Sequence, residues 1–367
     1  MKIFLSVTLL LAMTLPASQA SGAGYKLETV ADDLAYPWSV AFLPAGELLL
    51  AERGGNLRII SANGSVGEAL QGVPESYVES QGGFHDVVLH PDFDDNQLVY
   101  LAFAHGRPDA NGTRIIRGRL TDNALVDVEV IFTVEPLKAT AVHYGGKLQF
   151  LPDGKLLLTT GDGFDYREEA QNKDSMLGKT IRINDDGSVP ADNPFVGQEG
   201  NDKIFTWGHR NSQGLTLDTV TGTIYLHEHG PRGGDEVNKL EAGKNYGWPA
   251  ITYGINYSGA YVSPFTEHPS MEQPLKYWVP SIAPSGLAYY NGDAFPQWKG
   301  DLFVGALVNK DVRRLDMENG QVVGEEILFA EMGERIRDIR VGPDGFIYIL
   351  TDSSSGKIVR VIPADLP

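Results

Sequence analysis

Apolar residues along the chain come in pairs of short runs, and each pair is joined by a tight turn. The clearest pair lies between residues 148 and 160, where Pro152, Asp153 and Gly154 separate an apolar run from a second run, Leu156 to Thr160. Proline presets φ for a turn, and glycine supplies a positive φ where a side chain would clash. The pattern predicts a hairpin of two apolar strands, which is typical of strands packed between neighbouring sheets.

The same pattern recurs along most of the chain. Five further stretches follow it, at residues 38–52, 84–103, 214–226, 284–305 and 336–350. Repeats that start roughly 45 to 75 residues apart predict an all-β fold, a six-bladed β-propeller with four-stranded antiparallel blades. The alternative is a sandwich, or two domains with coincidental turns, but six matches favour the propeller. Residues 25–30 and 357–361 are expected to pair and close the ring, and the best helix candidate is 167–176.

Composition agrees with one large domain, expected to span residues 21–367. The chain has 367 residues, 42% of them hydrophobic, and it contains 42 glycines and 21 prolines, which fits many turns. Its formal net charge of −18 argues against nucleic acid and against an anionic membrane surface as partners. The absence of cysteine from the sequence excludes disulfides, cysteine nucleophiles and thiolate metal sites.

The N-terminus has the pattern of a secretory signal peptide. Lys2 precedes an apolar run from Ile3 to Leu15, and Pro16 and small residues up to Ala20 follow it. The run is too short to be a stable membrane anchor, and no second run of membrane length follows. We therefore expect residues 1–20 to be removed and the rest to be exported, with no membrane span.

A histidine and an aspartate flank the first hairpin described. His143 precedes its first strand and Asp162 follows its second, so antiparallel pairing would bring the two together. A carboxylate that accepts a ring N–H fixes the histidine tautomer and leaves the other nitrogen free as a base. The alternative is a histidine at a strand end and an aspartate that merely forms a turn.

Polar groups also precede other repeats, and a propeller gathers such groups at one end of its central channel. The candidates are Gln81, Arg210, Asn211, Arg335 and Arg337, with Lys310 after the paired strand of the fifth repeat. Arginines and a lysine gathered in an acidic protein predict a ligand with carboxylates or phosphates. The alternative is that each arginine pairs with a local acid, which contributes little.

A glycine-rich loop follows the fourth repeat and is a candidate metal site. His227 and His229 alternate on a strand and face one side, which permits a transition-metal pair. The run Gly-Pro-Arg-Gly-Gly-Asp-Glu, which ends at Glu236, suits a hard cation better, because Ca²⁺ takes mixed carbonyl and carboxylate oxygens. The alternative is an ordinary glycine-rich loop.

These motifs together resemble the soluble quinoprotein aldose sugar dehydrogenases, the glucose/sorbosone dehydrogenase group that uses pyrroloquinoline quinone (PQQ). The resemblance covers nearly all of the chain after residue 20, and the bacterial periplasmic members are the most similar. It rests on Tyr36-Pro-Trp, Gly82-Gly-Phe-His, His143-Tyr-Gly-Gly-Lys-Leu, Gly161-Asp-Gly, Gly208-His-Arg-Asn, His229-Gly-Pro-Arg-Gly-Gly-Asp-Glu and Asn245-Tyr-Gly-Trp-Pro. The family fold is a six-bladed propeller, as the repeat count also predicts.

The resemblance implies a periplasmic enzyme that oxidises aldoses at C1 to lactones. His143 would be the base and Asp162 the acid that orients it, while hydride passes to PQQ. The cofactor contacts implied are Gln81, Arg210, Asn211, Tyr257, Lys310, Arg335 and Arg337. Carbonyls of Gly230 and Pro231 would hold the Ca²⁺ at the quinone, and Glu236 and Tyr246 a second, structural Ca²⁺. An external electron acceptor is also implied.

One departure from the family bears on specificity. The glucose-preferring branch carries a carboxylate directly before the catalytic histidine, whereas Val142 stands there in this chain. We therefore expect a broad aldose range, and shortened loops predict a monomer. Two other functions stay open: a Ca²⁺-dependent propeller lactonase, which predicts acidic residues around the channel mouth, and a non-catalytic exported binding propeller.

Overall fold

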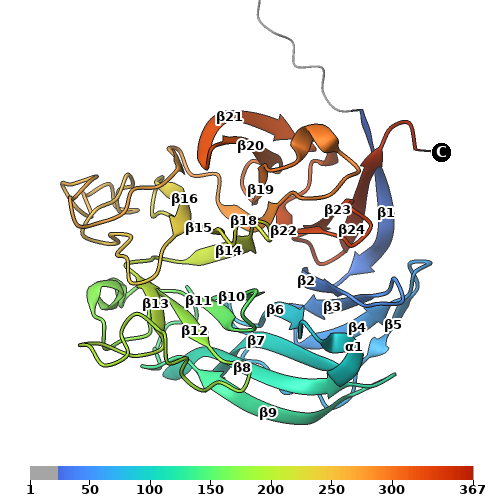
Figure 1. Ribbon diagram of the computed structural model, residues 1–367, viewed down its shortest axis with the longest axis horizontal. Coiled ribbons are helices and arrows are strands. Elements are labelled where there is room, and N and C mark those ends of the chain that lie inside the picture. Colours follow the sequence, from blue (N-terminus) through green and yellow to red (C-terminus); the bar gives the residue numbers. More distant parts are fainter. Residues whose placement is uncertain (1–23, 367) are drawn as a thin grey trace, which may run out of the picture.

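The computed structural model describes residues 24–366, which form six four-stranded sheets arranged in a ring (Figure 1). The predicted signal peptide, residues 1–20, lies outside the described residues. Neighbouring strands within every sheet run antiparallel, so the prediction of a six-bladed β-propeller with four-stranded antiparallel blades is confirmed.

Each blade takes four strands in order from the central axis outwards. Blades 1 and 2 are β2 (Pro37–Phe42), β3 (Leu48–Glu52), β4 (Asn56–Ile60), β5 (Val66–Ala69), then β6 (Phe84–Leu89), β7 (Leu98–Arg107), β8 (Ala110–Leu120), β9 (Leu125–Thr133). Blades 3 and 4 are β10 (Gly145–Phe150), β11 (Leu156–Thr160), β12 (Lys179–Ile183), β13 (Ile204–Trp207), then β14 (Ser212–Leu217), β15 (Ile224–Glu228), β16 (Asp235–Leu240), β17 (Lys276–Trp278). Blade 5 is β18 (Pro284–Tyr289), β19 (Leu302–Ala306), β20 (Val312–Glu318), β21 (Gln321–Leu328). Blade 6 is β22 (Ile336–Val341), β23 (Ile347–Thr351), β24 (Gly356–Pro363) and, from the other end of the chain, β1 (Tyr25–Leu34).

The ring closes by pairing the two ends of the described chain. β1 is the outermost strand of blade 6 and pairs antiparallel with β24, from Tyr25 opposite Pro363 to Leu34 opposite Gly356. This confirms the predicted pairing of residues 25–30 with 357–361. The ring is therefore held shut by backbone hydrogen bonds between residues more than 320 positions apart, such as Glu28 and Arg360.

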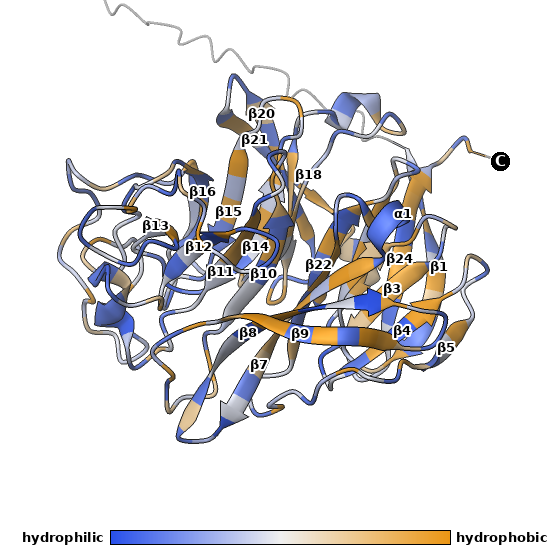
Figure 2. Ribbon diagram, turned by 60° about the horizontal axis from the view of Figure 1, so that its bottom comes forward, coloured by the Kyte–Doolittle hydropathy of each residue, from blue (hydrophilic) through white to orange (hydrophobic). Residues whose placement is uncertain are grey.

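Apolar side chains fill the spaces between neighbouring blades. Leu49 and Leu57 of blade 1 share a cluster with Leu101 and Ile116 of blade 2, and all four are fully or almost fully buried. In Figure 2 the hydrophobic colour follows the strands, while the connecting loops are mostly hydrophilic. Strands buried on both faces explain why the apolar runs in the sequence are continuous instead of alternating.

Helical structure is sparse among residues 24–366. It comprises α1 (Phe93–Asn96) and three 3₁₀ turns, η1 (Arg167–Gln171), η2 (Pro296–Trp298) and η3 (Ala330–Met332). The predicted helix over 167–176 was wrong in length, because only η1 forms. The buried ammonium of Lys179 donates hydrogen bonds to the carbonyls of Glu169 and Ala170 in η1 and of Leu177 after it. None of these helical segments is long and apolar enough to cross a bilayer.

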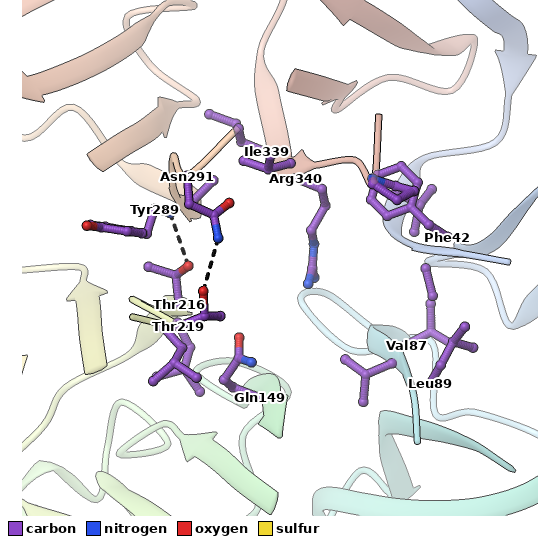
Figure 3. A pocket seen from close by; sticks show the side chains of 18 of the residues that line it. Phe42, Val87, Leu89, Gln149, Thr216, Thr219, Tyr289, Asn291, Ile339 and Arg340 are labelled. Carbon is purple, nitrogen blue, oxygen red and sulfur yellow. Dashed lines mark hydrogen bonds between the residues drawn. The ribbon is translucent and has the colours of Figure 1, made fainter. Parts of the chain in front are cut away.

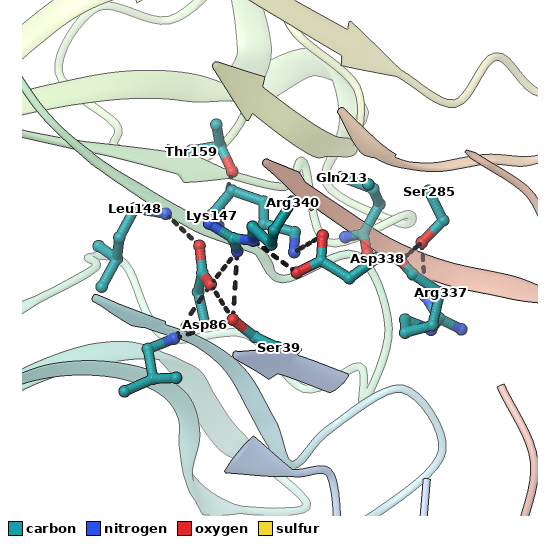
Figure 4. A network of polar contacts seen from close by, with 12 residues as sticks. Ser39, Asp86, Lys147, Leu148, Thr159, Gln213, Ser285, Arg337, Asp338 and Arg340 are labelled. Carbon is teal, nitrogen blue, oxygen red and sulfur yellow. Dashed lines mark hydrogen bonds and ion pairs between the residues drawn. The ribbon is translucent and has the colours of Figure 1, made fainter. Parts of the chain in front are cut away.

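An ionic network crosses the central axis between the innermost strands (Figure 4). Lys147 of β10 donates to Asp338 of β22 at 3.0 Å, and Arg340 of β22 bridges Asp338 at 2.8 Å and Asp86 of β6 at 2.6 Å. Both carboxylates are buried. Strands from three blades are thereby tied together at the axis.

Candidate active site

Residues of all six blades enclose a cavity of about 340 Å³ at one end of the channel. Most of its walls come from two kinds of position, the start of the first strand of a blade and the end of the second strand, and Tyr257 is added from the loop between β16 and β17. The predicted residues among its lining are Gln81, His143, Arg210, Asn211, Tyr257, Arg335 and Arg337. Seven of the predicted site residues therefore meet in one place, although they come from different blades.

His143 and Asp162 form the centre of this region. The Nδ1 of His143 lies 2.6 Å from Oδ1 of Asp162, and both side chains are buried. Asp162 also accepts hydrogen bonds from the backbone N–H of Phe164 and, through Oδ2, from the indole N–H of Trp248 at 2.8 Å. Because a carboxylate only accepts, Nδ1 of His143 carries the hydrogen and Nε2 is left with a free lone pair.

The backbone at His143 is held in an uncommon conformation. Its φ is +52°, a left-handed value that costs a non-glycine residue free energy and needs outside support. Gln81 supplies support by accepting the backbone N–H of His143 at 2.8 Å, and Asn211 accepts the N–H of Gly145 at 3.2 Å. Two predicted cofactor contacts therefore also fix the position of the histidine.

Burial and neighbouring charges set the protonation of the pair. Burial lowers the pKa of His143 below 6.5, and the positive charge of Arg210 acts in the same direction, while the bond to Asp162 opposes both. Burial alone would raise the pKa of Asp162, but the hydrogen bond from His143 and the positive charge of Arg210 hold it below its usual value. At neutral pH the pair is thus a neutral imidazole beside a carboxylate, as a general base requires.

The cavity is strongly basic within an acidic protein. Its charged lining consists of Arg53, Arg210, Arg335, Arg337 and a single acid, Asp352. Asp352 accepts hydrogen bonds from both Arg335 and Arg337, so the net charge of this lining is 4 − 1 = +3 with histidines neutral. Such a pocket suits a ligand that carries several carboxylates.

Several buried polar atoms in the cavity wall have no partner within residues 24–366. They are Nε2 of His85, Nε2 of His229 and Nε of Arg337. Arg337 also lies with its guanidinium 3.7 Å from the ring centre of Trp38, which adds an aromatic wall. Unpartnered buried polar groups are costly, so these atoms favour a polar ligand in the cavity.

A second cavity, of about 290 Å³, adjoins the first and shares His143, Arg210 and Tyr257 with it. Asp162, Trp248 and Pro231 also line it. Tyr257 is 63% exposed and stacks on Phe164 with ring centres 6.3 Å apart. The candidate base is therefore accessible from two adjoining spaces, one of which is basic.

Lys310 does not line either cavity, in contrast to the predicted cofactor contact. It lies on the loop between β19 and β20, at the same end of the propeller, and its side chain is exposed. Leu307 of that loop lines the 340 Å³ cavity instead. The loop is placed as expected, and Lys310 has a left-handed backbone with a φ of +58°.

The two carbonyls expected to hold a catalytic Ca²⁺ lie beside the histidine pair. The carbonyl of Gly230 accepts a hydrogen bond from Nη1 of Arg210 at 2.7 Å, and Pro231 lines the 290 Å³ cavity. Asp235 fixes this loop by accepting the N–H of Gly230 at 2.9 Å. Carbonyl oxygens suit Ca²⁺, and a carbonyl has a second lone pair, but a cation at Gly230 requires Arg210 to shift.

Glu236 and Tyr246 fit a second cation unequally. Glu236 stands directly opposite Glu228 in the β15–β16 register, and burial, with the charge of Glu228 added, raises the pKa of Glu236 well above its usual value. The buried Oδ1 of Asn238 lies nearby without a partner in residues 24–366. Two facing carboxylates and a free carbonyl oxygen suit Ca²⁺. The hydroxyl of Tyr246 is already bonded to the backbone at Lys239 and Glu241, so only its carbonyl could serve as a ligand.

The alternative of a transition metal at His227 and His229 finds no support in residues 24–366. No group of three or more histidine, aspartate or glutamate side chains there could hold a metal. His227 is fully buried and its Nε2 lies 3.0 Å from the carbonyl of Gly286 in the next blade. A ring nitrogen facing a carbonyl must donate, so His227 joins two blades.

The lining residues that sequence reasoning missed include Arg53, Trp38, Trp248 and Asp352. Arg53 and Asp352 directly follow the second strands of blades 1 and 6, the position that Asp162 and His229 occupy near the ends of the second strands of blades 3 and 4. The signal was present in the repeat, because a polar residue after the second strand recurs from blade to blade. Trp248 belongs to a motif that was noted but given no role.

A further cavity, of about 660 Å³, opens at the other end of the innermost strands (Figure 3). Apolar side chains such as Val87, Leu89 and Ile339 line most of it, and Arg340 extends towards it from the ionic network. It holds neither His143 nor any of the four arginines of the basic cavity. Although this cavity is larger than the basic cavity, it lacks the histidine–aspartate pair, so we do not assign the active site to it.

Comparisons with known proteins agree with this geometry. The family model described as Glucose / Sorbosone dehydrogenase matches residues 34–360. Aldose sugar dehydrogenase YliI of Escherichia coli (strain K12) is 41% identical over 351 residues, which cover 94% of each chain. The crystal structure of the soluble aldose sugar dehydrogenase of Escherichia coli in the apo form has a TM-score of 0.89 at 41% identity, covering 92% of this chain and 99% of that one. The PQQ-bound form of aldose sugar dehydrogenase from Streptomyces coelicolor has a TM-score of 0.76 at 25% identity, covering 93% and 100%.

Proposed function

The chain belongs to the glucose/sorbosone dehydrogenase family, and we propose that it is a PQQ-dependent aldose dehydrogenase that oxidises C1 of sugars to lactones. The observation that carries the proposal is the buried His143–Asp162 pair, 2.6 Å apart, beside a cavity lined by four arginines. A dehydrogenase of this kind needs a base for the sugar hydroxyl and a site for an anionic cofactor, and the two adjoin here.

The residues present fit PQQ, which bears three carboxylates. Arg53, Arg210, Arg335 and Arg337 offer guanidinium groups, which pair with carboxylates through two parallel hydrogen bonds. The unpartnered Nε of Arg337 and the Nε2 atoms of His85 and His229 offer further contacts within the same walls. Gln81, Asn211 and Tyr257 are further proposed cofactor contacts, and Lys310, on the exposed loop after β19, stays a proposed contact although it lines neither cavity.

His143 acts as the base in this proposal. Its Nε2 takes the proton of the anomeric hydroxyl, while Asp162 keeps the ring oriented and stabilises the imidazolium that forms. The C1–H bond breaks as the C1–O double bond forms, so the sugar loses one proton and one hydride. When bound, PQQ supplies the two-electron hydride acceptor, and Ca²⁺ at the carbonyls of Gly230 and Pro231 would act as a Lewis acid.

Arg210 holds a central place because it faces both the base and the proposed Ca²⁺ carbonyls. It donates to the carbonyls of His229 and Gly230, and its charge favours neutral His143. The guanidinium therefore has to move if Ca²⁺ takes the Gly230 carbonyl, and the carboxylates of the cofactor are the natural new partners. Glu236, with the carbonyl of Tyr246, is proposed to hold a second, structural Ca²⁺.

Substrate range, assembly and location are proposed from the sequence. Val142 precedes the base where a carboxylate would contact sugar hydroxyls, so a broad aldose range is expected. The protein is proposed to act as a periplasmic monomer that passes electrons to an external acceptor. The lactonase alternative predicted acidic residues around the channel mouth, whereas the cavity has four arginines and one aspartate.

The test is dye reduction by the purified protein with a mixture of aldoses, with and without added PQQ and Ca²⁺. Activity that requires PQQ and is increased by Ca²⁺ supports the proposal. The bound quinone should absorb in the near-ultraviolet to visible range and bleach when sugar is added. Folded protein that reduces no dye with PQQ and Ca²⁺ present would overturn the proposal.

A further inference from the structure

Lys138 is a buried lysine in the segment that leads to His143 of the candidate site. Its side chain is 1% exposed, and within residues 24–366 it forms no ion pair with a carboxylate. It lies in the segment 134–144, which crosses from β9 of blade 2 to β10 of blade 3 and carries His143 at its end. Burying an ammonium without a counter-ion is costly, so such a group is retained only where its charge or its contacts are needed.

The ammonium of Lys138 ties the segment that carries His143 to blade 2. Nζ donates to Oδ1 of Asn111 at 3.0 Å and to the carbonyl of Thr140 at 2.5 Å, and it lies 3.5 Å from the ring centre of Tyr144. The hydroxyl of Tyr144 donates to the same Asn111 oxygen at 2.6 Å. The backbones of Lys138 and Asn111 also form an isolated antiparallel bridge, so the segment is fixed on both sides of the lysine.

The same segment contacts the loop that carries Asp162. The stem of Lys138 packs against Gly163, where an added Cβ would lie 2.7 Å from its Cδ. Thr140 donates through Oγ1 to the carbonyl of Gly163 at 2.6 Å. Lys138 therefore links the segment that carries His143 to the loop that carries Asp162, and it lines neither cavity.

We propose that Lys138 is a positioning residue for the His143–Asp162 pair: it holds the segment that carries His143 against the loop that carries Asp162, and it places a positive charge near the imidazole. The inference deepens the proposed function and rests on it for the role of His143. The charge favours neutral His143, the form that can accept a proton, and it is shielded from solvent by Tyr144 and Gly163.

The charged groups around the pair agree in direction. Burial lowers the pKa of Lys138 to about 7, and Asp162 opposes that shift. The ammonium is therefore still charged over the range below pH 6.5 where His143 titrates. Burial is the main cause of the lowered pKa of His143, Arg210 and Lys138 add to it, and Asp162 opposes it. Burial and Lys138 also lower the pKa of His85, in the wall of the basic cavity, to about 3.

The test is the titration of His143 by nuclear magnetic resonance of the histidine rings, in protein without added PQQ. The chain has eight histidines, and the signal of His143 is identified by its loss in His143→Ala. Lys138→Met keeps the stem and removes the charge, so the titration midpoint of His143 should rise by roughly half to one pH unit. Lys138→Gln, which keeps polar contacts to Asn111 and Thr140, should give the same direction and serves if Lys138→Met does not fold.

Lys179→Met is the matched control. Lys179 is equally buried, its pKa is also lowered to about 7 by burial, and its ammonium bonds to backbone carbonyls, but it does not act on His143. A midpoint of His143 that is unchanged in Lys138→Met and Lys138→Gln, or that moves as far in Lys179→Met, would overturn the inference. With PQQ bound, the acid limb of the pH–rate profile should move upward with the midpoint. Because the resonance needs no turnover, it decides the role of Lys138 even if the protein proves not to be a dehydrogenase.

Discussion

His143 combines a left-handed backbone, a buried ring and a ring nitrogen, Nε2, that is free to accept a proton. If Nε2 is the base, His143→Ala should lower turnover with saturating PQQ by roughly 10²–10⁴-fold, the usual loss for a positioned general base. Cofactor affinity should change little, because the arginines stay in place. The check is kcat for dye reduction beside a PQQ titration, with exposed His268→Ala as the control. A near-normal rate in the PQQ-saturated variant would remove His143 from this role.

The protonation of His143 also predicts the pH dependence of the rate. A base is active only when neutral, so activity falls as pH drops through its pKa. Burial and Arg210 lower that pKa below 6.5, so the acid limb of kcat/KM should lie below pH 6.5. A profile of kcat/KM over roughly pH 5 to 8, the range in which folded proteins are usually most stable, measures the limb. An acid limb above pH 6.5 would contradict neutral, buried His143 as the base.

At the scale of the strand, the site is built from two recurring positions of the blade. The site residues at the start of the first strands could be predicted from the sequence, because polar groups such as Gln81, Arg210 and Arg335 directly precede the apolar repeats. The residue after each second strand also faces the cavity, and this position supplies Arg53 and Asp352, which the sequence analysis did not predict. Lys310 lies in the expected loop but lines neither cavity, because the repeat predicts where a loop lies and not which of its side chains face the channel.

β22 gives the sharpest prediction at this scale, because it begins between the two arginines that hold Asp352. Arg337→Ala removes a guanidinium that contacts Ser285, Asp352 and Trp38 in the cavity wall. A lost charge-assisted hydrogen bond should weaken PQQ binding by roughly 10–100-fold. Fluorescence or activity titration with PQQ measures the change.

Arg313→Ala is the control for that titration. Arg313 lies on β20, is also partly buried and bonds to two acids, Asp311 and Glu325, but it does not line the cavity. Its loss should lower stability without changing PQQ affinity. Equal PQQ affinity in Arg337→Ala and the wild type would count against an anion site at the first strand of blade 6.

At the scale of the whole molecule, the ring of six blades could be predicted from the sequence. Each blade of a propeller contains a similar hairpin, and both faces of that hairpin are buried between neighbouring blades. Continuous apolar runs therefore recur, and even uneven spacing leaves the count of six intact. The ionic network at the axis was not predictable, because Asp86, Lys147 and Asp338 lie more than 50 residues apart and meet only when the ring closes. Closure is thus the step that converts six similar hairpins into one site.

Closure itself depends on β1, and Leu34 is the residue that tests it. Leu34 is 1% exposed, pairs opposite Gly356 and belongs to a cluster with Ile60 of blade 1 and Ile358 of blade 6. Leu34→Ala should lower the free energy of unfolding by about 2–5 kcal/mol, as expected for a leucine buried in a packed core. Asp32→Ala, an exposed neighbour on the same strand, should change it by less than about 0.5 kcal/mol. Equal free energies of unfolding for Leu34→Ala and Asp32→Ala would show that β1 does not hold the ring closed. Because the site joins blades 1 and 6 through Trp38 and Arg337, bound PQQ should also raise the thermal midpoint of the Leu34→Ala protein.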